Sequence, residues 1–471
     1  MQLAIYMQLA GKIAGIIDKG TYKPGEKLPS LRKIHQDTGI SIGTILQAFN
    51  HLQDIGLITS REKSGYFVSQ QPGRTLPLPQ IIPASLSEQT IRIDNVLRKL
   101  RKDKPGNNFI SFANAIPDQR LLPFNGIKRA IQQISRDTSA GYLELADTKG
   151  LPQLREALAR RAFTWGGALH EEDLIITNGA TEALNLNLRA ITKPGDTVLV
   201  QEPCYYGVMQ CLEFLDLRAV TIPCHSDTGI DIDDLTAACN KYDIRACILV
   251  SNFNNPTGAM LSSEKKKKIA AFANQHKLPI IEDDIYGDLY LEGSRPDTIK
   301  TYDKNGWVLL VSSFSKSLSP GFRLGYTAPG RFTYEVARFK SMNNGGTAHL
   351  LQKVLYELLH TGAYDRHLQQ LRKQLHKNLL LTSRLIEQYF PKGTKLTRPR
   401  GGLVLWVELP KHVNAVQLQD AAYEQGIGLA PGEIFSASAG YKNYIRISYC
   451  TQWGTKVEKA LAKMGKLASL G

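Results

Sequence analysis

Five short runs of apolar residues recur along this 471-residue chain, and helical patterns fill the stretches between them. The runs are residues 174–177, 198–200, 247–250, 278–281 and 308–311. Nearly continuous apolar strands that alternate with helices are typical of a mostly parallel sheet that is buried on both faces. We therefore predict an α/β domain whose functional residues lie just beyond the carboxyl ends of these strands.

Small, polar and aromatic residues follow the first three runs. Residues 178–183 (Asn-Gly-Ala-Thr-Glu-Ala) form a glycine-containing turn that opens a helix, and such turns present backbone N–H groups to phosphate. Tyr205 and Tyr206 follow the second run, and Asn255 follows the third within Asn-Asn-Pro-Thr-Gly at 254–258. Each feature alone also fits ordinary packing or a simple turn.

The last two runs end in ionisable side chains. Asp283 follows the fourth run, three residues before Tyr286, and Ser-Phe-Ser-Lys at 313–316 follows the fifth. A lysine in that place is usually solvated, whereas an unpaired acid at the end of a buried strand is costly. Pyridoxal 5'-phosphate (PLP) requires a lysine amine, an acid at its pyridinium nitrogen, a donor to its phenolate oxygen and a phosphate cradle. The five strand ends together therefore predict a PLP site.

The first seventy residues show a different pattern, three short helices followed by a hairpin. Apolar positions within residues 6–17 fit one helical face, and Ser30 and Ser41 are placed to cap two further helices. Two β-rich runs at 57–59 and 66–68 flank a glycine-containing turn. This order predicts a winged helix-turn-helix whose third helix enters the major groove of DNA. A small helical cap with solvated basic residues is the alternative.

Composition narrows the class of protein. The formal net charge of +15 favours a polyanionic partner such as nucleic acid. No apolar run approaches the roughly 20 residues that span a bilayer, and no signal peptide is visible, so we expect no membrane association. Six cysteines without a C-x-x-C pair indicate reduced thiols and a cytoplasmic protein. The histidines lack metal-ligand spacing, so we expect no metal site, and the four lysines at 265–268 are expected to form a solvated helix face.

We expect three parts along the chain. Residues 1–70 form the DNA-binding domain, residues 71–108 a connector, and residues 109–471 the PLP-binding domain. Prolines make 71–86 an extended, semi-rigid linker. Basic and apolar residues interleave at 91–102, which predicts an amphipathic helix that packs on the large domain or, alternatively, contacts phosphates beside the DNA.

The head resembles the DNA-binding domain of GntR-type bacterial regulators. The resemblance rests on Pro-Gly-Glu-Lys-Leu-Pro-Ser-x-Arg at 24–32, Gly-Ile-Ser at 39–41 and Lys-Ser-Gly at 63–65. Many relatives carry arginine after that serine, but this chain has Ile42, so strong guanine readout from this position is lost. The residues implied for DNA binding are Ser30 and Arg32 at phosphates, Ser41 and Thr44 at the groove, Lys63 and Gly65 in the wing, with Gln47 and His51 as further polar candidates on the groove face.

Residues from 109 onward resemble fold-type I PLP-dependent aminotransferases. Two motifs carry this resemblance, Asn-Asn-Pro-Thr-Gly at 254–258 and Ser-Phe-Ser-Lys-x-x-x-Pro-Gly-x-Arg-x-Gly at 313–325. Joined to the GntR-like head, the whole chain resembles the MocR-type regulators. The resemblance implies a fold-type I transferase domain, which is a mostly parallel sheet flanked by helices, with a small C-terminal α+β subdomain.

The same resemblance implies a role for each strand-end residue. Lys316 would carry the internal aldimine, and Asp283 would keep the pyridine nitrogen protonated. Arg446 would take the α-carboxylate of a substrate by a two-pronged contact, with a structural salt bridge as the alternative. The remaining cofactor contacts implied are Asn255 and Tyr286 at the phenolate oxygen, Tyr205 on the ring face, Gly179, Ala180, Thr181, Ser313, Ser315 and Arg323 at the phosphate, and Tyr142 of the partner subunit, also at the phosphate.

These features predict a PLP-dependent, DNA-binding transcriptional regulator that senses an amine or amino acid through an external aldimine. The alternatives are an active aminotransferase that carries a DNA-binding head, and a large domain that serves only as a dimerisation scaffold. We expect at most residual aminotransferase activity. The family implies a head-to-tail homodimer on double-stranded operator DNA. The resemblance implies that relatives responsive to γ-aminobutyrate use an additional arginine shortly after the stacking tyrosine. This chain has no cation at Tyr206-Gly207-Val208, so we do not predict a sensor of γ-aminobutyrate.

Overall fold

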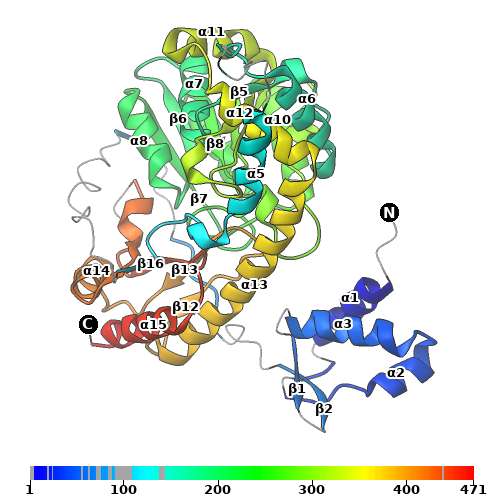
Figure 1. The fold of residues 1–471 in the computed structure, drawn as a ribbon. Coiled ribbons are helices and arrows are strands. Elements are labelled where there is room, and N and C mark those ends of the chain that lie inside the picture. The colour runs from blue at the N-terminus through cyan, green and yellow to red at the C-terminus, as the bar shows by residue number, and fades with distance from the viewer. Residues whose placement is uncertain are drawn as a thin grey trace.

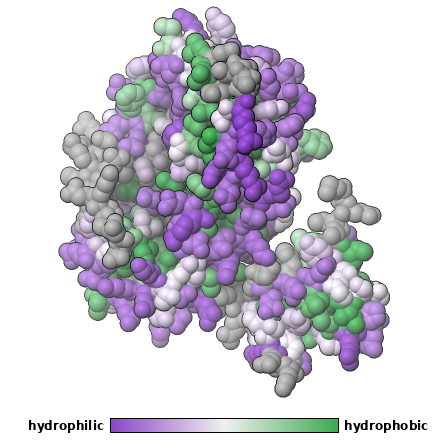
Figure 2. Space-filling view, in the orientation of Figure 1, coloured by the Kyte–Doolittle hydropathy of each residue, from purple (hydrophilic) through white to green (hydrophobic). Residues whose placement is uncertain are grey.

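The structure is a computed structural model that describes residues 5–18, 21–23, 25–54, 57–61, 64–69, 76–82, 87–90, 109–136, 143, 145–437 and 440–470. Figure 1 shows a small helical head, in blue, and a larger α/β body. On the face shown in Figure 2, hydrophilic residues cover most of the large domain.

The head contains three helices and a two-stranded antiparallel sheet. They are α1 (Ile5–Asp18), α2 (Leu31–Thr38), α3 (Ile42–Asp54), β1 (Ile58–Arg61) and β2 (Gly65–Val68). Ser30 caps α2 by accepting the N–H of Lys33 at 3.2 Å, and Ser41 accepts the N–H of Thr44 at 3.2 Å. The apolar positions that the sequence places on helical faces are buried in one core, among them Leu9, Ile45, Phe49 and Leu52. The predicted winged helix-turn-helix is confirmed.

The body is built on an eight-stranded sheet with the order β3-β7-β6-β8-β9-β10-β11-β5. Strands β7, β6, β8, β9 and β10 run parallel, whereas β11 pairs antiparallel with both of its neighbours and β3 pairs antiparallel at the edge. The strands are β3 (Glu88–Thr90), β5 (Ile175–Thr177), β6 (Thr197–Glu202), β7 (Arg218–Pro223), β8 (Ile244–Leu249), β9 (Ile280–Asp283), β10 (Val308–Ser313) and β11 (Gly325–Ala328). The mostly parallel sheet is confirmed, and the sequence runs correspond to β5, β6, β8, β9 and β10.

Helices cover both faces of this sheet. On strand β6, Val198 and Val200 pack with side chains of α7 and α8, whereas Leu199 packs with side chains of α9 and α10. Alternating residues therefore bury against opposite layers, which is why the strands are apolar throughout. The helices of the body are α5 (Phe124–Ser135), α6 (Pro152–Ala162), α7 (Ala180–Ile191), α8 (Tyr206–Phe214), α9 (Ile232–Lys241), α10 (Ser263–His276), α11 (Thr333–Asn344), α12 (His349–His360), α13 (Ala363–Tyr389), α14 (Ala415–Glu424) and α15 (Thr455–Ala468).

The C-terminal part forms a smaller sheet with the order β12-β13-β16-β15, paired antiparallel. Its strands are β12 (Lys395–Leu396), β13 (Val404–Glu408), β15 (Ala430–Pro431) and β16 (Tyr444–Ser448), and a short parallel pair joins β14 (Ile427–Gly428) to β4 (Ile110–Ser111). Helix α13 runs from the large domain to this sheet (Figure 1). Short 3-10 helices occupy Gln119–Leu121, Phe163–Trp165, Glu171–Asp173, Gly287–Leu289, Lys300–Tyr302, Pro320–Phe322, Gly330–Phe332 and Gly432–Phe435. The small α+β subdomain is confirmed.

The linker is bonded to the small subdomain. The N–H of Gln80 donates to a carboxylate oxygen of Glu408 at 2.7 Å, and the hydroxyl of Tyr444 donates to the carbonyl of Gln80 at 3.2 Å. The N–H of Leu396 donates to the carbonyl of Pro77 at 2.9 Å. Residues 76–82 therefore lie along β12, β13 and β16, which the sequence did not indicate because each bond joins distant parts of the chain.

Two further expectations need comment. Strand β3, within the expected linker, was not predicted, and the basic helix expected at 91–102 lies outside the described residues.

The expectation of a solvated face at 265–268 is wrong for Lys266, whose side chain is 1% exposed. Its ammonium donates to Asn252 at 2.8 Å and to the carboxylate of Asp297 at 2.9 Å, because α10 turns this position toward the core. Among the described residues, no helix is long and apolar enough to cross a membrane.

Candidate functional site

Lys316 lies just beyond the carboxyl end of β10, at the centre of the predicted site. Its ammonium donates to the carbonyl of Ala115 at 2.8 Å. Burial lowers the pKa of the Lys316 amine to about 8, since the enclosed site disfavours the charged form. A larger fraction of this amine is therefore neutral near pH 8 than for an ordinary lysine, and the neutral amine is the nucleophile that condenses with an aldehyde.

Asp283 ends β9, the strand next to β10. Burial raises the pKa of its carboxyl to about 7. The N–H of Ile285 donates to one carboxylate oxygen at 3.2 Å, and among the described residues no cationic side chain forms an ion pair with it. The N–H of a protonated pyridine would supply the missing cationic partner.

Asn255, Tyr286 and Arg446 form a chain of hydrogen bonds beside Lys316. The Asn255 amide donates to the Tyr286 hydroxyl at 3.4 Å, and the Arg446 guanidinium donates to the Asn255 amide oxygen at 3.0 Å. A second guanidinium nitrogen of Arg446 donates to the carbonyl of Ala113. The buried Nε–H of Arg446 has no hydrogen-bond partner among the described residues. Arg446 is therefore prepared to donate to an arriving carboxylate, rather than being held by a structural ion pair in the described part of the chain.

The turn before α7 and the loop after β10 form an anion cradle. Gly179 has φ +82°, and a Cβ there would lie 2.9 Å from a guanidinium nitrogen of Arg323, so only glycine allows this approach. Ala180 and Thr181 form the first turn of α7, whose N–H groups have no partner within the helix. Ser313 accepts the N–H of Ser315 at 3.1 Å. The buried hydroxyl of Ser315 lacks a partner among the described residues, as expected where a phosphate oxygen binds.

Tyr205 precedes α8 and closes another wall of the same region. A Cβ on Gly207 would lie 2.4 Å from the Tyr205 ring, so the absence of a side chain at Gly207 leaves room for this ring. Its ring centroid is 4.5 Å from that of Tyr206. Burial raises the pKa of the Tyr205 hydroxyl above its usual range, and the charge of Arg446 offsets only part of this rise. Tyr142 lies outside the described residues, so its contact with the phosphate stays a prediction.

The residues brought together fit PLP as a set. The unpaired acid Asp283, the enclosed amine of Lys316 and the Ser315 hydroxyl match the pyridine nitrogen, the aldehyde and the phosphate of that cofactor. All of them lie at or just beyond the carboxyl ends of neighbouring parallel strands, as we predicted.

Sequence reasoning missed several neighbours of the site. The guanidinium carbon of Arg446 lies over the ring of Phe435, 4.9 Å from the ring centroid. Cys450 is buried beside Arg446 and Lys316, and burial raises the pKa of its thiol although the two nearby charges act to lower it. Asn114, Ser448 and Cys450 line one part of a cleft of about 750 Å³. Ser448 and Cys450 could have been found from the sequence only because they lie close to Arg446 in it.

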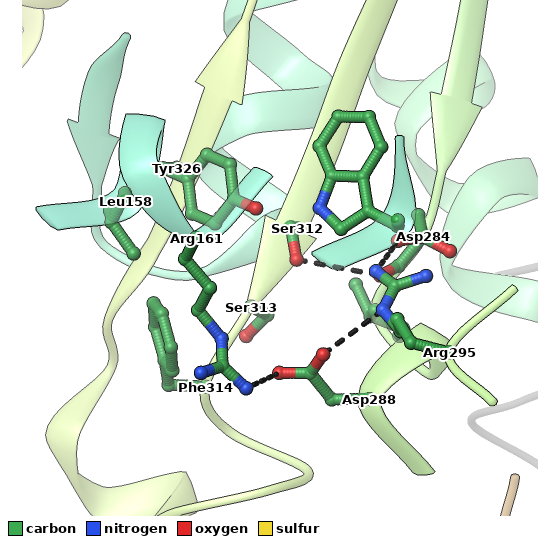
Figure 3. A pocket seen from close by; sticks show the side chains of 11 residues that line it. Leu158, Arg161, Asp284, Asp288, Arg295, Ser312, Ser313, Phe314 and Tyr326 are labelled. Carbon is green, nitrogen blue, oxygen red and sulfur yellow. Dashed lines mark hydrogen bonds and ion pairs between the residues drawn. The ribbon is translucent and has the colours of Figure 1, made fainter. Parts of the chain in front are cut away.

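A separate, enclosed cavity adjoins the end of β10, where Ser312 and Ser313 line it. Its walls include Arg161, Asp288, Arg295 and Ser313, and its volume of about 20 Å³ holds about one water molecule (Figure 3). Its charged groups bond one another, so it is a polar core and not a ligand pocket.

The residues predicted for DNA contact lie on the surface of the head. Arg32, Ser41, Gln47 and Gly65 are exposed. The Ser41 and Thr44 hydroxyls lie 2.8 Å apart and bond each other at the start of α3. Lys63 and the His51 side chain lie outside what the structure describes. The apolar side chain of Ile42 is 44% exposed at the N-terminus of α3.

Comparison with known proteins addresses both parts of the chain. The class I and II aminotransferase family matches residues 107–464, and the gntR family of bacterial regulatory proteins matches residues 5–68. The "uncharacterized HTH-type transcriptional regulator YdcR" of Escherichia coli is 36% identical over 462 residues, covering 98% of each chain. A second such regulator of Escherichia coli, YjiR, is also 36% identical and covers 98% of each chain.

Solved structures of aminotransferases share the fold of the body. LysN, the α-aminoadipate aminotransferase of Thermus thermophilus in complex with N-(5'-phosphopyridoxyl)-L-leucine, aligns with a TM-score of 0.73 and 27% identity over 79% of this chain and 94% of that one. The multiple substrate aminotransferase of Thermococcus profundus gives a TM-score of 0.73 and 25% identity over 80% and 94%. The chain therefore belongs to the class I and II aminotransferase family, and it joins to this fold a head of the gntR family of bacterial regulatory proteins.

Proposed function

We propose that this protein is a PLP-dependent transcriptional regulator of the MocR type. The head binds operator DNA, and the body binds PLP at Lys316 and takes an amine or amino acid as effector. The observation that carries the proposal is the pocket at the strand ends, where Asp283 forms no ion pair with a described residue and Lys316 has an amine with a lowered pKa, in a chain that also contains a winged helix.

Each of these side chains has a proposed contact with the cofactor. Asp283 would hold the proton of the ring nitrogen, Asn255 and Tyr286 would donate to the phenolate oxygen, and Tyr205 would cover the ring. Arg323, Ser315 and the first turn of α7 would hold the phosphate. When bound, PLP supplies an aldehyde that condenses with amines and a ring that withdraws electrons.

Arg446 selects the chemical class of the effector. Its Nε–H, which has no partner among the described residues, and the nitrogen now bonded to Ala113 can donate side by side to one carboxylate. An amino acid would therefore use its amine to displace Lys316 from the cofactor and its carboxylate to bind Arg446, whereas a simple amine would use only the first of these interactions. The effector changes DNA binding only by its difference in affinity for the two arrangements of heads and body.

The proposal includes a head-to-tail homodimer in the cytoplasm, with Tyr142 of the partner subunit reaching the phosphate. A dimer presents two heads to a double-stranded operator, as helix-turn-helix proteins commonly require. The relatives support a regulator over an aminotransferase with an added head, because those named transcriptional regulators cover 98% of the chain, whereas the 2-aminoadipate transaminase of Thermus thermophilus covers 79%.

The experiment uses the full-length protein with and without PLP. Borohydride reduction followed by peptide mass spectrometry should find pyridoxyl on Lys316, and footprinting of the DNA upstream of its own gene should show a protected operator. Protection should change when a panel of amino acids is added to the PLP-loaded protein but not to Lys316→Ala. Equal protection by both proteins under every condition would refute the proposal, and sustained transamination at roughly one turnover per second would favour the enzyme.

A further inference from the structure

The loop that carries Lys316 is held by helix α13 through contacts on both sides of the lysine. The hydroxyl of Ser317 lies 2.7 Å from the hydroxyl of Tyr364, and the imidazole of His367 lies 2.8 Å from the carbonyl of Ser317. On the other side, the ring of Phe314 packs edge-on against Tyr364 with centroids 5.7 Å apart. Ser317, Tyr364 and His367 are all buried.

A charged cluster behind Tyr364 fixes the direction of its hydroxyl. Tyr364 donates to a carboxylate oxygen of Asp288 at 3.2 Å. Figure 3 shows that Arg161 and Arg295 converge on that same carboxylate, at 3.2 and 3.0 Å. The two guanidinium groups hold the pKa of Asp288 below its usual range despite its burial, so Asp288 is ionised and only accepts.

Tyr364 therefore donates its single hydroxyl hydrogen to Asp288 and can only accept from Ser317. It follows that Ser317 donates to the Tyr364 oxygen, which fixes the Ser317 rotamer. Arg161 also lies over the Tyr364 ring, 4.8 Å from guanidinium carbon to centroid, so the ring is fixed from a second direction. The residue next to Lys316 is thus bonded through Tyr364 to the charged cluster around Asp288.

We propose that Tyr364 is a positioning residue for Lys316, and that its hydroxyl fixes the loop 314–317 so that the lysine amine points into the pocket toward Asp283. This inference rests on the proposed function, in which Lys316 holds PLP. Tyr364 itself does not contact cofactor or effector.

The test compares Tyr364→Phe with the wild type. This change removes the hydroxyl alone and keeps the ring between Phe314 and Arg161. We expect PLP to leave the variant roughly three- to ten-fold faster, which corresponds to the loss of one buried hydrogen bond. We also expect the pH midpoint of the visible band of lysine-bound PLP to move, and the rate at which an amine reagent labels Lys316 in the PLP-free protein to change. Tyr356→Phe, on α12 with its ring stacked on His360, is the matched control and should leave all three values unchanged.

A second variant distinguishes loss of this contact from misfolding of Tyr364→Phe. Ser317→Ala breaks the same contact from the other side, and the double variant should release PLP no faster than either single variant, because both remove one interaction. Wild-type rates, midpoint and labelling in both single variants would overturn the positioning role while leaving the proposed function intact. A wild-type protein that takes up no PLP would overturn both.

Discussion

The cofactor pocket and the DNA-facing surface of the head present their functional groups in opposite ways. In the pocket, Lys316, Asp283 and Arg446 are enclosed, and burial shifts the pKa of all three. On the head, Arg32 and Gln47 project into solvent, and hydroxyls such as those of Ser30 and Ser41 cap helices. The pocket is therefore organised before its ligand arrives, whereas the head offers charges and donors that act only when DNA is present.

This difference indicates which interactions give the pocket its affinity for a ligand and the head its affinity for DNA. Enclosed polar groups without partners gain most from a ligand that satisfies them, so single substitutions in the pocket should have large effects. Exposed groups compete with water and salt, so single substitutions on the head should have smaller, salt-dependent effects. The linker at 76–82 joins the two parts, since Gln80 is bonded to Tyr444 on the strand that carries Arg446.

The largest effect is expected for Asp283→Asn. The substitution removes the negative charge opposite the pyridinium nitrogen, and the loss of a charge-assisted hydrogen bond should weaken PLP binding roughly 10- to 100-fold. Equilibrium dialysis or the visible absorbance of bound PLP measures this. An unchanged affinity would show that Asp283 is not the partner of the ring nitrogen.

The same variant should be more stable than the wild type when PLP is absent and the pH is high. Folding raises the pKa of Asp283, so the folded chain holds this proton more tightly than the unfolded chain does. The contribution of Asp283 to stability is therefore complete at low pH and is lost as the pH rises through about 7. Thermal unfolding of the PLP-free proteins should show a higher Tm for Asp283→Asn at pH 8 and a smaller difference at pH 5, since the loss sets in above the usual carboxyl pKa of 3.8. The reverse order at pH 8 would contradict the burial argument.

On the head, Arg32→Ala should weaken operator binding about ten-fold at low salt. Loss of one phosphate contact should also reduce the slope of log affinity against log salt by about 0.9. Lys33→Ala is the matched control, because Lys33 is exposed on the same helix but is paired with Asp37 at 2.9 Å. Fluorescence anisotropy over a salt series distinguishes the two. Equal slopes for both variants would remove Arg32 from the interface.

Ser315→Ala should weaken PLP binding roughly three- to ten-fold, because its unpartnered hydroxyl is expected to donate to the phosphate. The matched control is Ser312→Ala on β10, whose hydroxyl donates to the carbonyl of Asp284 on the side of the enclosed cavity. Competition with inorganic phosphate separates the two serines, since only the Ser315 variant should lose affinity for that anion as well. If both variants lost the same PLP affinity, the loss would reflect a disturbed loop and not a missing hydrogen bond to the phosphate.

The smallest effect is expected for Tyr444→Phe, which removes one bond between β16 and the linker. PLP binding should be unchanged, and the change in operator affinity on adding effector should fall roughly two-fold. Tyr441→Phe, in the same aromatic cluster with its centroid 5.1 Å from that of Tyr444, is the control. If Tyr444→Phe leaves the effector response at its wild-type size, the bonded linker does not transmit the signal.

The strand-end residues were predictable because the pattern is local. An apolar run followed by Asp283, or by Ser315 and Lys316, is visible within a few positions, and parallel strands bring such ends together. Helix caps such as Ser30 were predictable for the same reason. The sequence did not reveal the contact between Ser317 and Tyr364, because its partners lie 47 positions apart and only packing joins them.

Other features were hidden because the tertiary structure overrides local polarity. Lys266 stands in a run of four lysines that fits a solvated face, yet Asp297 and Asn252 bind it inside the protein. The bond between Gln80 and Glu408 joins positions 328 apart, so the attachment of the linker has no local signal. Strand β3 consists of three residues at the edge of the sheet, too few for a period to be read.

Coupling between pocket and head is the central claim, and thermodynamic linkage tests it most directly. The affinity of an effector amino acid, followed by the absorbance of lysine-bound PLP, should be measured with and without saturating operator DNA. The account predicts that DNA changes the effector affinity by the same factor by which the effector changes the DNA affinity. Identical effector affinities with and without DNA, in a protein that binds both, would contradict it.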